Sequence, residues 1–201
     1  MQKLIDAAVG YIRVLFAENT DGHDMEHSLR VYRNAMMIFS EERRGDPLVI
    51  SLAALLHDTD DKKLFHTDDN ENARSFLQTQ GIDDKTIQKI CSVINGVSFS
   101  KNKGKRPETP EGEIVQDADR LDAIGAVGIA RTFAYGGKHG RTPESSIQHF
   151  YEKLLLLRDL MNTETAKKMA ESRHQFTETF LKEWEKENTA EIEILRQSNL
   201  W

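Results

Sequence analysis

Cysteine is almost absent from the sequence: Cys91 is the only one among 201 residues. A single thiol cannot form a disulfide within the chain. Long apolar runs are absent too, since none approaches the roughly 18 residues that a membrane-spanning helix needs. The first residues, "MQKLIDAAVGYIRVLFAEN", place apolar side chains at helical spacing and do not read as a signal peptide. We therefore expect a cytoplasmic enzyme or binding protein with no membrane partner.

An excess of basic residues is also missing. The chain has 27 lysines and arginines against 33 aspartates and glutamates, a formal charge of -6. Proteins that grip the phosphate backbone of nucleic acids without regard to sequence are usually basic. A nucleic-acid polymer is therefore not an expected partner. Small anionic substrates stay compatible with this composition, because local bases or a metal ion can outweigh the global charge.

Alternating strand patterns are not found either, and helical periodicity runs through the chain. No internal repeat or low-complexity linker divides it. The pattern predicts one all-α domain over residues 1–201, a helical bundle with an apolar segment, 48–56, at its centre. Gly125 and Gly128, inside a helical pattern, indicate close packing against neighbouring helices. The expected helices span residues 2–18, 25–44, 47–58, 70–80, 84–97, 112–133, 144–161 and 164–196.

One stretch within this pattern, "SLAALLHDTDDKK" at 51–63, combines an apolar helix with a histidine and three aspartates. The C-terminal end of a helix carries partial negative charge, which disfavours carboxylates there by up to roughly 1 kcal/mol. His57 also ends a segment that looks buried, so its imidazole needs a polar partner. Surface lysines such as Lys62 and Lys63 offer one explanation for the acids. A bound cation offers the other, and both stay open at this point.

Two further segments carry residues of the same chemical types. His27 begins a helical segment in which Arg30 lies on the same stripe, and taken alone it fits a partly exposed helix start. Asp119 and Asp122 are three residues apart and share a helix face, and alone they fit an acidic first turn. Together, two histidines and two carboxylates from three expected helices form a nitrogen-and-oxygen site that suits a divalent ion.

The order His27, His57-Asp58 and Asp119 resembles the H…HD…D signature of the HD superfamily of metal-dependent phosphohydrolases. The stretches "HSLRVYRNA", "ALLHDTDDKK" and "QDADRLDAIGAVGIARTF" are similar to a small bacterial subgroup of these hydrolases. The similarity covers roughly residues 20–180.

The resemblance implies an all-helical fold of the HD-domain type and one divalent ion, which could be Mn, Fe, Co, Ni, Mg or Zn. It implies hydrolysis of a phosphoester or phosphoanhydride, most often in a nucleotide, by water that the metal activates. The metal ligands that it implies are His27, His57, Asp58 and Asp119.

The same resemblance suggests catalytic roles for Asp58 and for Asp61, three residues later, which would orient or deprotonate the attacking water or protonate the leaving group. Two departures disfavour hydrolysis of alarmone nucleotides: Lys62 follows Asp61 in place of a second acid, and Asp122-Ala123 replaces a His-Asn pair. Only His66 is available as an additional histidine before Asp119, which favours one metal over two.

Phosphate groups need cations around them, and charge-assisted hydrogen bonds from Arg and Lys suit them. We expect Arg30, one turn from His27, and Lys62, just after the His-Asp pair, to face the substrate. Lys101, in the loop "SKNKGKR", and Asp122 are assigned to the same side. The loop at 135–143 fits either a lid or an ordinary connection.

Other functions compete with this interpretation. A nucleotide-sensing domain would bind the same ligand without turnover, and Asp61 argues against it because a sensor needs no extra acid. A zinc protease would use His23 and His27 of "HDMEH", similar to the HExxH pattern but with Asp24 in place of Glu. A homodimer is a further possibility, because Phe176, Phe180 and Trp184 form an apolar stripe that suits either the core or an interface.

Overall fold

The computed structural model describes residues 1–17, 24–62, 64–98, 102 and 105–197, with side chains as far as Thr189. Within these ranges the regular structure is helical and no strand occurs, which confirms the all-α prediction. Among the described residues, no helix combines the length and apolar character that crossing a membrane requires. The α-helices are α1 (Gln2–Leu15), α2 (Met25–Glu42), α3 (Pro47–Leu56), α4 (Glu71–Thr79), α5 (Asp84–Val97), α7 (Pro110–Asp122), α8 (Gly125–Lys138), α9 (Pro143–Glu152) and α10 (Glu164–Gln197).

Helix α3 lies at the centre of the first group of helices, where α1, α2, α5 and α7 pack around it. Every residue from 49 to 56 is buried, as expected for an apolar segment at the middle of a bundle. Asp46 caps the helix by accepting a hydrogen bond from the backbone N–H of Leu48 at 2.8 Å. All faces of α3 are buried, so the chain is still inside the bundle where the helix ends. The C-cap residue His57 therefore lies in the interior.

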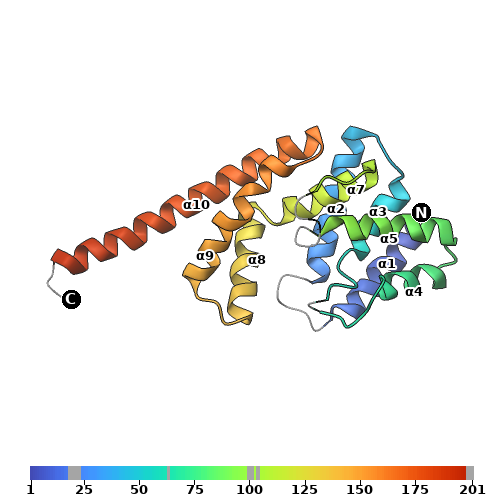
Figure 1. The fold of residues 1–201 in the computed structure, drawn as a ribbon, viewed down its shortest axis with the longest axis horizontal. Helices are drawn as coiled ribbons and strands as arrows, with labels where there is room; N and C mark the ends of the chain where they lie inside the picture. The colour runs from blue at the N-terminus through green and yellow to red at the C-terminus, as the bar shows by residue number, and fades with distance from the viewer. Residues whose placement is uncertain (18–23, 63, 99–101, 103–104, 198–201) are drawn as a thin grey trace.

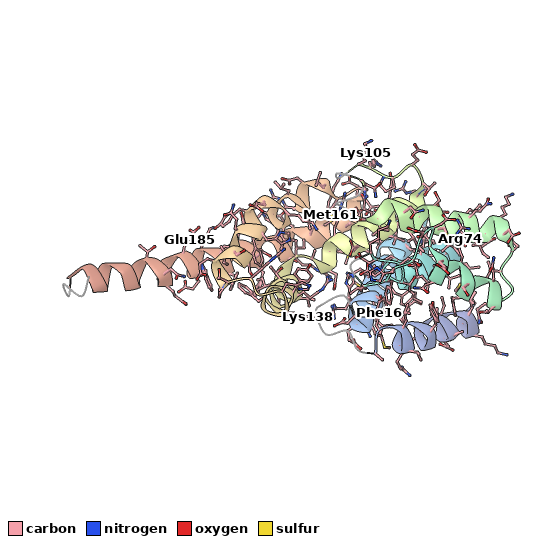
Figure 2. All side chains as sticks on the ribbon, turned by 60° about the horizontal axis from the view of Figure 1, so that its bottom comes forward. Phe16, Arg74, Lys105, Lys138, Met161 and Glu185 are labelled. Carbon is pink, nitrogen blue, oxygen red and sulfur yellow. The ribbon has the colours of Figure 1, made fainter. Side chains whose placement is uncertain are left out.

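Helices α8, α9 and α10 form a second group, which Figure 1 shows to the left of the first. Helix α10 packs on both α7 and α8, and α9 packs on α8. The hydroxyl of Tyr151 donates to Glu185 at 2.6 Å, near the point where α10 leaves the rest of the molecule in Figure 2. Phe180 and Trp184 pack against Phe133, whereas Phe176 is 54% exposed.

The single helix expected over 112–133 was wrong, because the structure has two helices there. Ile124 is extended and Gly125 has φ +76°, a conformation that L side chains rarely adopt, so the chain leaves α7 and starts α8. The expected close packing at the glycines is observed. A Cβ on Gly128 would lie 2.3 Å from the carbonyl of Ala123, and one on Gly125 would lie 3.1 Å from Arg173.

The helix expected over 144–161 was also too long. Helix α9 ends at Glu152, and two short 3₁₀ segments follow, η1 (Leu154–Leu156) and η2 (Arg158–Leu160). A 3₁₀ helix has three residues per turn, so Leu154 and Leu157 align on one face, and both are buried. The spacing of these two leucines thus matches the 3₁₀ geometry of this segment.

Candidate active site

Helices α2 and α3 bring two histidines together. Asp24 caps α2 and accepts a hydrogen bond from the backbone N–H of His27 at 2.8 Å, which places His27 in the first turn. His57 lies at the C-terminal cap of the buried helix α3. Their Nε2 atoms are 3.1 Å apart, and the two rings meet edge to face.

The outer nitrogens of both rings contact oxygen acceptors. His27 Nδ1 lies 2.7 Å from Asp122 Oδ2, and His57 Nδ1 lies 3.0 Å from the carbonyl oxygen of Ala54. A carboxylate and a carbonyl only accept hydrogen bonds, so each Nδ1 carries a proton. When both rings are neutral, the Nε2 lone pairs face each other, and an ion between them could bind both.

Two carboxylates complete this cluster. Asp58 Oδ2 lies 3.4 Å from His27 Nε2, and Asp58 Oδ1 lies 3.4 Å from His57 Nε2. Asp119 Oδ1 lies 3.4 Å from the first nitrogen and 3.8 Å from the second. Two ligand nitrogens at right angles around an ion, each about 2.0–2.1 Å from it, are roughly 3 Å apart. The donor set and its spacing therefore fit one divalent ion.

The electrostatics of the cluster favour positive charge. Burial and Arg131 lower the pKa of His27, but hydrogen bonds with Asp119, Asp122 and Asp58 outweigh them and raise it to about 10. Burial alone would raise the pKa of Asp119, yet hydrogen bonding to His27 holds it below its ordinary value. Asp119 therefore keeps its negative charge, and the cluster favours a positive charge, either the second proton of His27 or a cation that takes its place.

Asp122, which we assigned to the substrate side, lies behind His27, on the Nδ1 side of the ring. It is buried, and Arg30 Nε donates to its Oδ1 at 2.7 Å while Arg131 Nη1 donates to its Oδ2 at 2.9 Å. Burial raises the pKa of Asp122, but these contacts with His27 and the two arginines lower it well below its ordinary range. Arg30 is thus also engaged at this position.

The acids after His57 have separate surroundings. Asp60 accepts hydrogen bonds from the backbone N–H groups of Asn72 and Ala73, at 2.9 and 3.0 Å, in the first turn of α4. The backbone N–H of Asp61 donates to the carbonyl of Asp58, so the chain turns tightly between these two acids, and Asp61 is half-buried.

Of the remaining predicted residues, Lys62 is among those that the structure describes, and two others are not. Lys62 is exposed, and its ammonium pairs with Asp68 at 3.2 Å. Lys101, the fourth substrate-binding candidate, lies outside the described residues, and so does His23 of the protease alternative.

A pocket of about 220 Å³ adjoins the cluster, with Asp119 as the shared residue. It lies against α8 and α9, and its polar lining is mostly basic: Arg131, Arg141, His149 and Lys153, together with Thr132 and Tyr135. The ring of Tyr135 stacks on His139 and lies under the guanidinium of Arg141. Four basic side chains beside a metal-type cluster suit an anionic ligand.

Sequence reasoning missed this pocket. Arg131 and Tyr135 are four residues apart, as are His149 and Lys153, so each pair shares a helix face. That spacing was a usable signal. What brings the two pairs together is the turn between α8 and α9, which we considered only as a lid or a connection.

Residues 24–124, about half of the chain, match the HD domain family. The chain belongs to this family. The HD-domain protein is 38% identical over 186 residues to protein YpgQ of Bacillus subtilis strain 168, across 88% of this chain and 90% of YpgQ. It is 31% identical over 184 residues to protein L803 of Acanthamoeba polyphaga mimivirus, across 68% of this chain and 76% of L803.

Solved structures share the fold of the HD-domain protein. An HD-superfamily hydrolase from Bacillus thuringiensis superposes with a TM-score of 0.75 and 37% identity, over 94% of this chain and 98% of that one. B. subtilis YpgQ in complex with ADP superposes with a TM-score of 0.73 and 36% identity, over 90% of this chain and 97% of YpgQ. The chain therefore has the fold of the HD-superfamily hydrolases, as the resemblance predicted.

Proposed function

We propose that this protein is a divalent-metal-dependent phosphohydrolase that cleaves a phosphoester or phosphoanhydride bond of a nucleotide. The observation that carries the proposal is the junction at Asp119, which belongs both to the His–Asp cluster and to the basic pocket. A phosphate chain in that pocket would end beside the cluster. The ADP bound to the related protein YpgQ supports a nucleotide as the ligand.

The residues that would hold the ion are His27, His57, Asp58 and Asp119, whose donor atoms converge from α2, α3 and α7. When bound, the ion would lower the pKa of coordinated water and neutralise charge that develops on the phosphoryl oxygens. Arg131, Arg141 and Lys153 would bind the phosphate oxygens through charge-assisted hydrogen bonds and fix the scissile group near Asp119.

Asp61 is the acid that we assign to proton transfer. It follows Asp58, a proposed ligand, by one turn of backbone and is half-buried. A carboxylate in that place would orient the attacking water, take its proton or deliver one to the leaving oxygen. Lys62, in its exposed ion pair, has less access to the reacting group than the pocket cations.

The test is release of phosphate and pyrophosphate from a panel of ribo- and deoxyribonucleotides, with Mn²⁺, Co²⁺, Mg²⁺ or Zn²⁺. We compare the natural protein with Asp58→Ala and Asp61→Ala, and we use Asp68→Ala as the matched control because Asp68 is an exposed acid of the same segment. Turnover should require metal and disappear in the first two variants only. Asp61→Ala should still bind Mn²⁺, because Asp61 is not among the proposed ligands.

Two results would contradict the proposed function. Turnover that survives Asp58→Ala would place the reaction outside this cluster. Nucleotide and metal binding without any turnover would replace the hydrolase by a nucleotide sensor.

A further inference from the structure

The carboxylate of Asp122 contacts the one nitrogen of His27 that the proposed ion would not use. Its Oδ2 lies 2.7 Å from His27 Nδ1. Because a carboxylate can only accept, this contact places a proton on Nδ1. It therefore leaves Nε2 as the nitrogen that can offer a lone pair toward His57, Asp58 and Asp119.

Two arginines hold Asp122 in turn. Arg30, one helical turn after His27 on α2, donates from Nε to Oδ1 at 2.7 Å and from Nη2 to Oδ2 at 3.3 Å. Arg131, on α8, donates from Nη1 to Oδ2 at 2.9 Å. The side chain of Asp122 is only 2% exposed. It is thus held by groups on α2 and α8 while its own backbone lies at the end of α7.

We propose that Asp122 is a positioning residue, which fixes the ring orientation and the tautomer of His27, and that Arg30 and Arg131 hold it in this role. The inference rests on the proposed function, because it takes His27 Nε2 to be a ligand of the divalent ion. Carboxylates that hold the outer nitrogen of a metal-binding histidine commonly act in this way. Asp122 would then act on the ion only through His27.

The experiment measures the Mn²⁺ affinity of the full chain by calorimetry in the natural protein, in Asp122→Ala and in Asp122→Asn. Loss of such an outer carboxylate typically weakens metal binding about 10- to 100-fold, which is the result we expect for Asp122→Ala. Asp122→Asn keeps an oxygen that can accept from Nδ1, so its affinity should fall between the other two. Because asparagine also keeps the shape of the side chain, the state of the Nδ1 proton, measured below, separates the acceptor from the packing.

Asp117→Asn is the matched control, because Asp117 is a buried aspartate of the same helix. Its carboxylate accepts hydrogen bonds from Asn162 and Thr163, just before α10, and these partners take no part in the His–Asp cluster. This variant should lower the melting temperature and leave the Mn²⁺ affinity unchanged. Circular dichroism would confirm that each variant is folded.

A second readout follows the tautomer directly, by NMR of ¹⁵N-labelled histidine in the Zn²⁺-loaded protein. The Nδ1 proton of His27 should be protected in the natural protein and in Asp122→Asn, and should exchange rapidly with solvent in Asp122→Ala. If Asp122→Ala does not fold, the Mn²⁺ affinity of Asp122→Asn decides alone: weaker binding than in the natural protein supports the proposal, and equal binding overturns it.

Other outcomes separate this inference from the proposed function. Folded Asp122→Ala with the Mn²⁺ affinity of the natural protein would overturn the positioning role and leave the metal site standing. A natural protein that binds none of the divalent ions would overturn both.

Discussion

Three aspartates follow the buried helix α3, and each has a different environment. Asp58 faces the two histidines, Asp60 holds the start of α4, and Asp61 is half-buried one backbone turn after Asp58. The unfavourable position of these acids at a helix C-terminus therefore has two separate compensations. One is the imidazole cluster with its proposed ion, and the other is the N-terminus of a neighbouring helix.

Asp60→Ala tests the structural part of this division. Two backbone N–H groups of α4 would lose a charged acceptor, so the free energy of unfolding should fall by about 1–3 kcal/mol. Urea denaturation measures the loss, with Asp68→Ala as an exposed control that should change little. A fall in Mn²⁺ affinity as large as that of Asp58→Ala would contradict the separation of the two roles.

Lys153→Ala tests the basic pocket. Removing one cation from the phosphate side should raise KM for the nucleotide about tenfold, while kcat changes little, because the lost interaction is made in both ground and transition states. Lys167→Ala is the control, since Lys167 pairs with Glu164 on the exposed surface of α10. A fall in kcat with unchanged KM would assign Lys153 to the chemistry instead of to binding.

At the level of elements, the junction of α7 and α8 sets the pocket beside the cluster. Asp119 lies on α7 and Arg131 on α8. The break at Ile124 and Gly125 changes the chain direction between these two helices. Gly128 lets the second helix approach the end of the first, where a side chain would meet the carbonyl of Ala123. The position of the basic pocket relative to the His–Asp cluster thus depends on Gly125 and Gly128.

Gly128→Ala should lower the free energy of unfolding by about 1–3 kcal/mol, because the added methyl group overlaps backbone atoms that cannot move away easily. Gly137→Ala, in the same helix, has open space around the new methyl group and should be neutral or stabilising by up to about 1 kcal/mol. Guanidinium denaturation of both variants provides the comparison. Equal stability of the two would show that the junction repacks without cost.

Sequence periodicity predicted most of the helices, because their apolar stripes are regular. It failed at Gly125, where one left-handed residue breaks an otherwise continuous helical pattern. The cluster of His27, His57, Asp58 and Asp119 was predicted from the order of these residues along the chain, which resembles the HD signature, because His27 and Asp119 taken alone fit ordinary helix positions. For the basic pocket the sequence offers only the four-residue spacing within each pair, and the pairs meet only once α8 and α9 fold against each other.

At the scale of the whole molecule, the proposed ion would join α2, α3 and α7. An ion that binds only the folded chain stabilises it by about 2.7 kcal/mol at a concentration 100 times its dissociation constant. Mn²⁺ should therefore raise the melting temperature of the natural protein, and EDTA should reverse the shift. In His57→Ala the shift should largely vanish, and an undiminished shift would locate the ion elsewhere.

The single domain over 1–201 and the homodimer both stay predictions. Of the apolar stripe on α10, Phe180 and Trp184 pack against Phe133 within the chain, which leaves Phe176 as its exposed member. Size-exclusion chromatography with light scattering of the 201-residue chain measures the molar mass directly. A mass near twice the 23.0 kDa of one chain would support the dimer.

The apolar helix α3 also matters before the protein is folded. Its sequence, apolar except for Ser51 and buried from Val49 onward in the native state, is exposed in the nascent chain and is the kind of segment that initiates aggregation. Asp46 stands immediately before it, and Asp58, Asp60 and Asp61 follow closely after it. Charged residues that flank an apolar segment oppose its association with the same segment of other chains. These aspartates thus also act as gatekeeper residues against aggregation. Replacing them by neutral residues should reduce the yield of soluble protein even where the folded state tolerates the change.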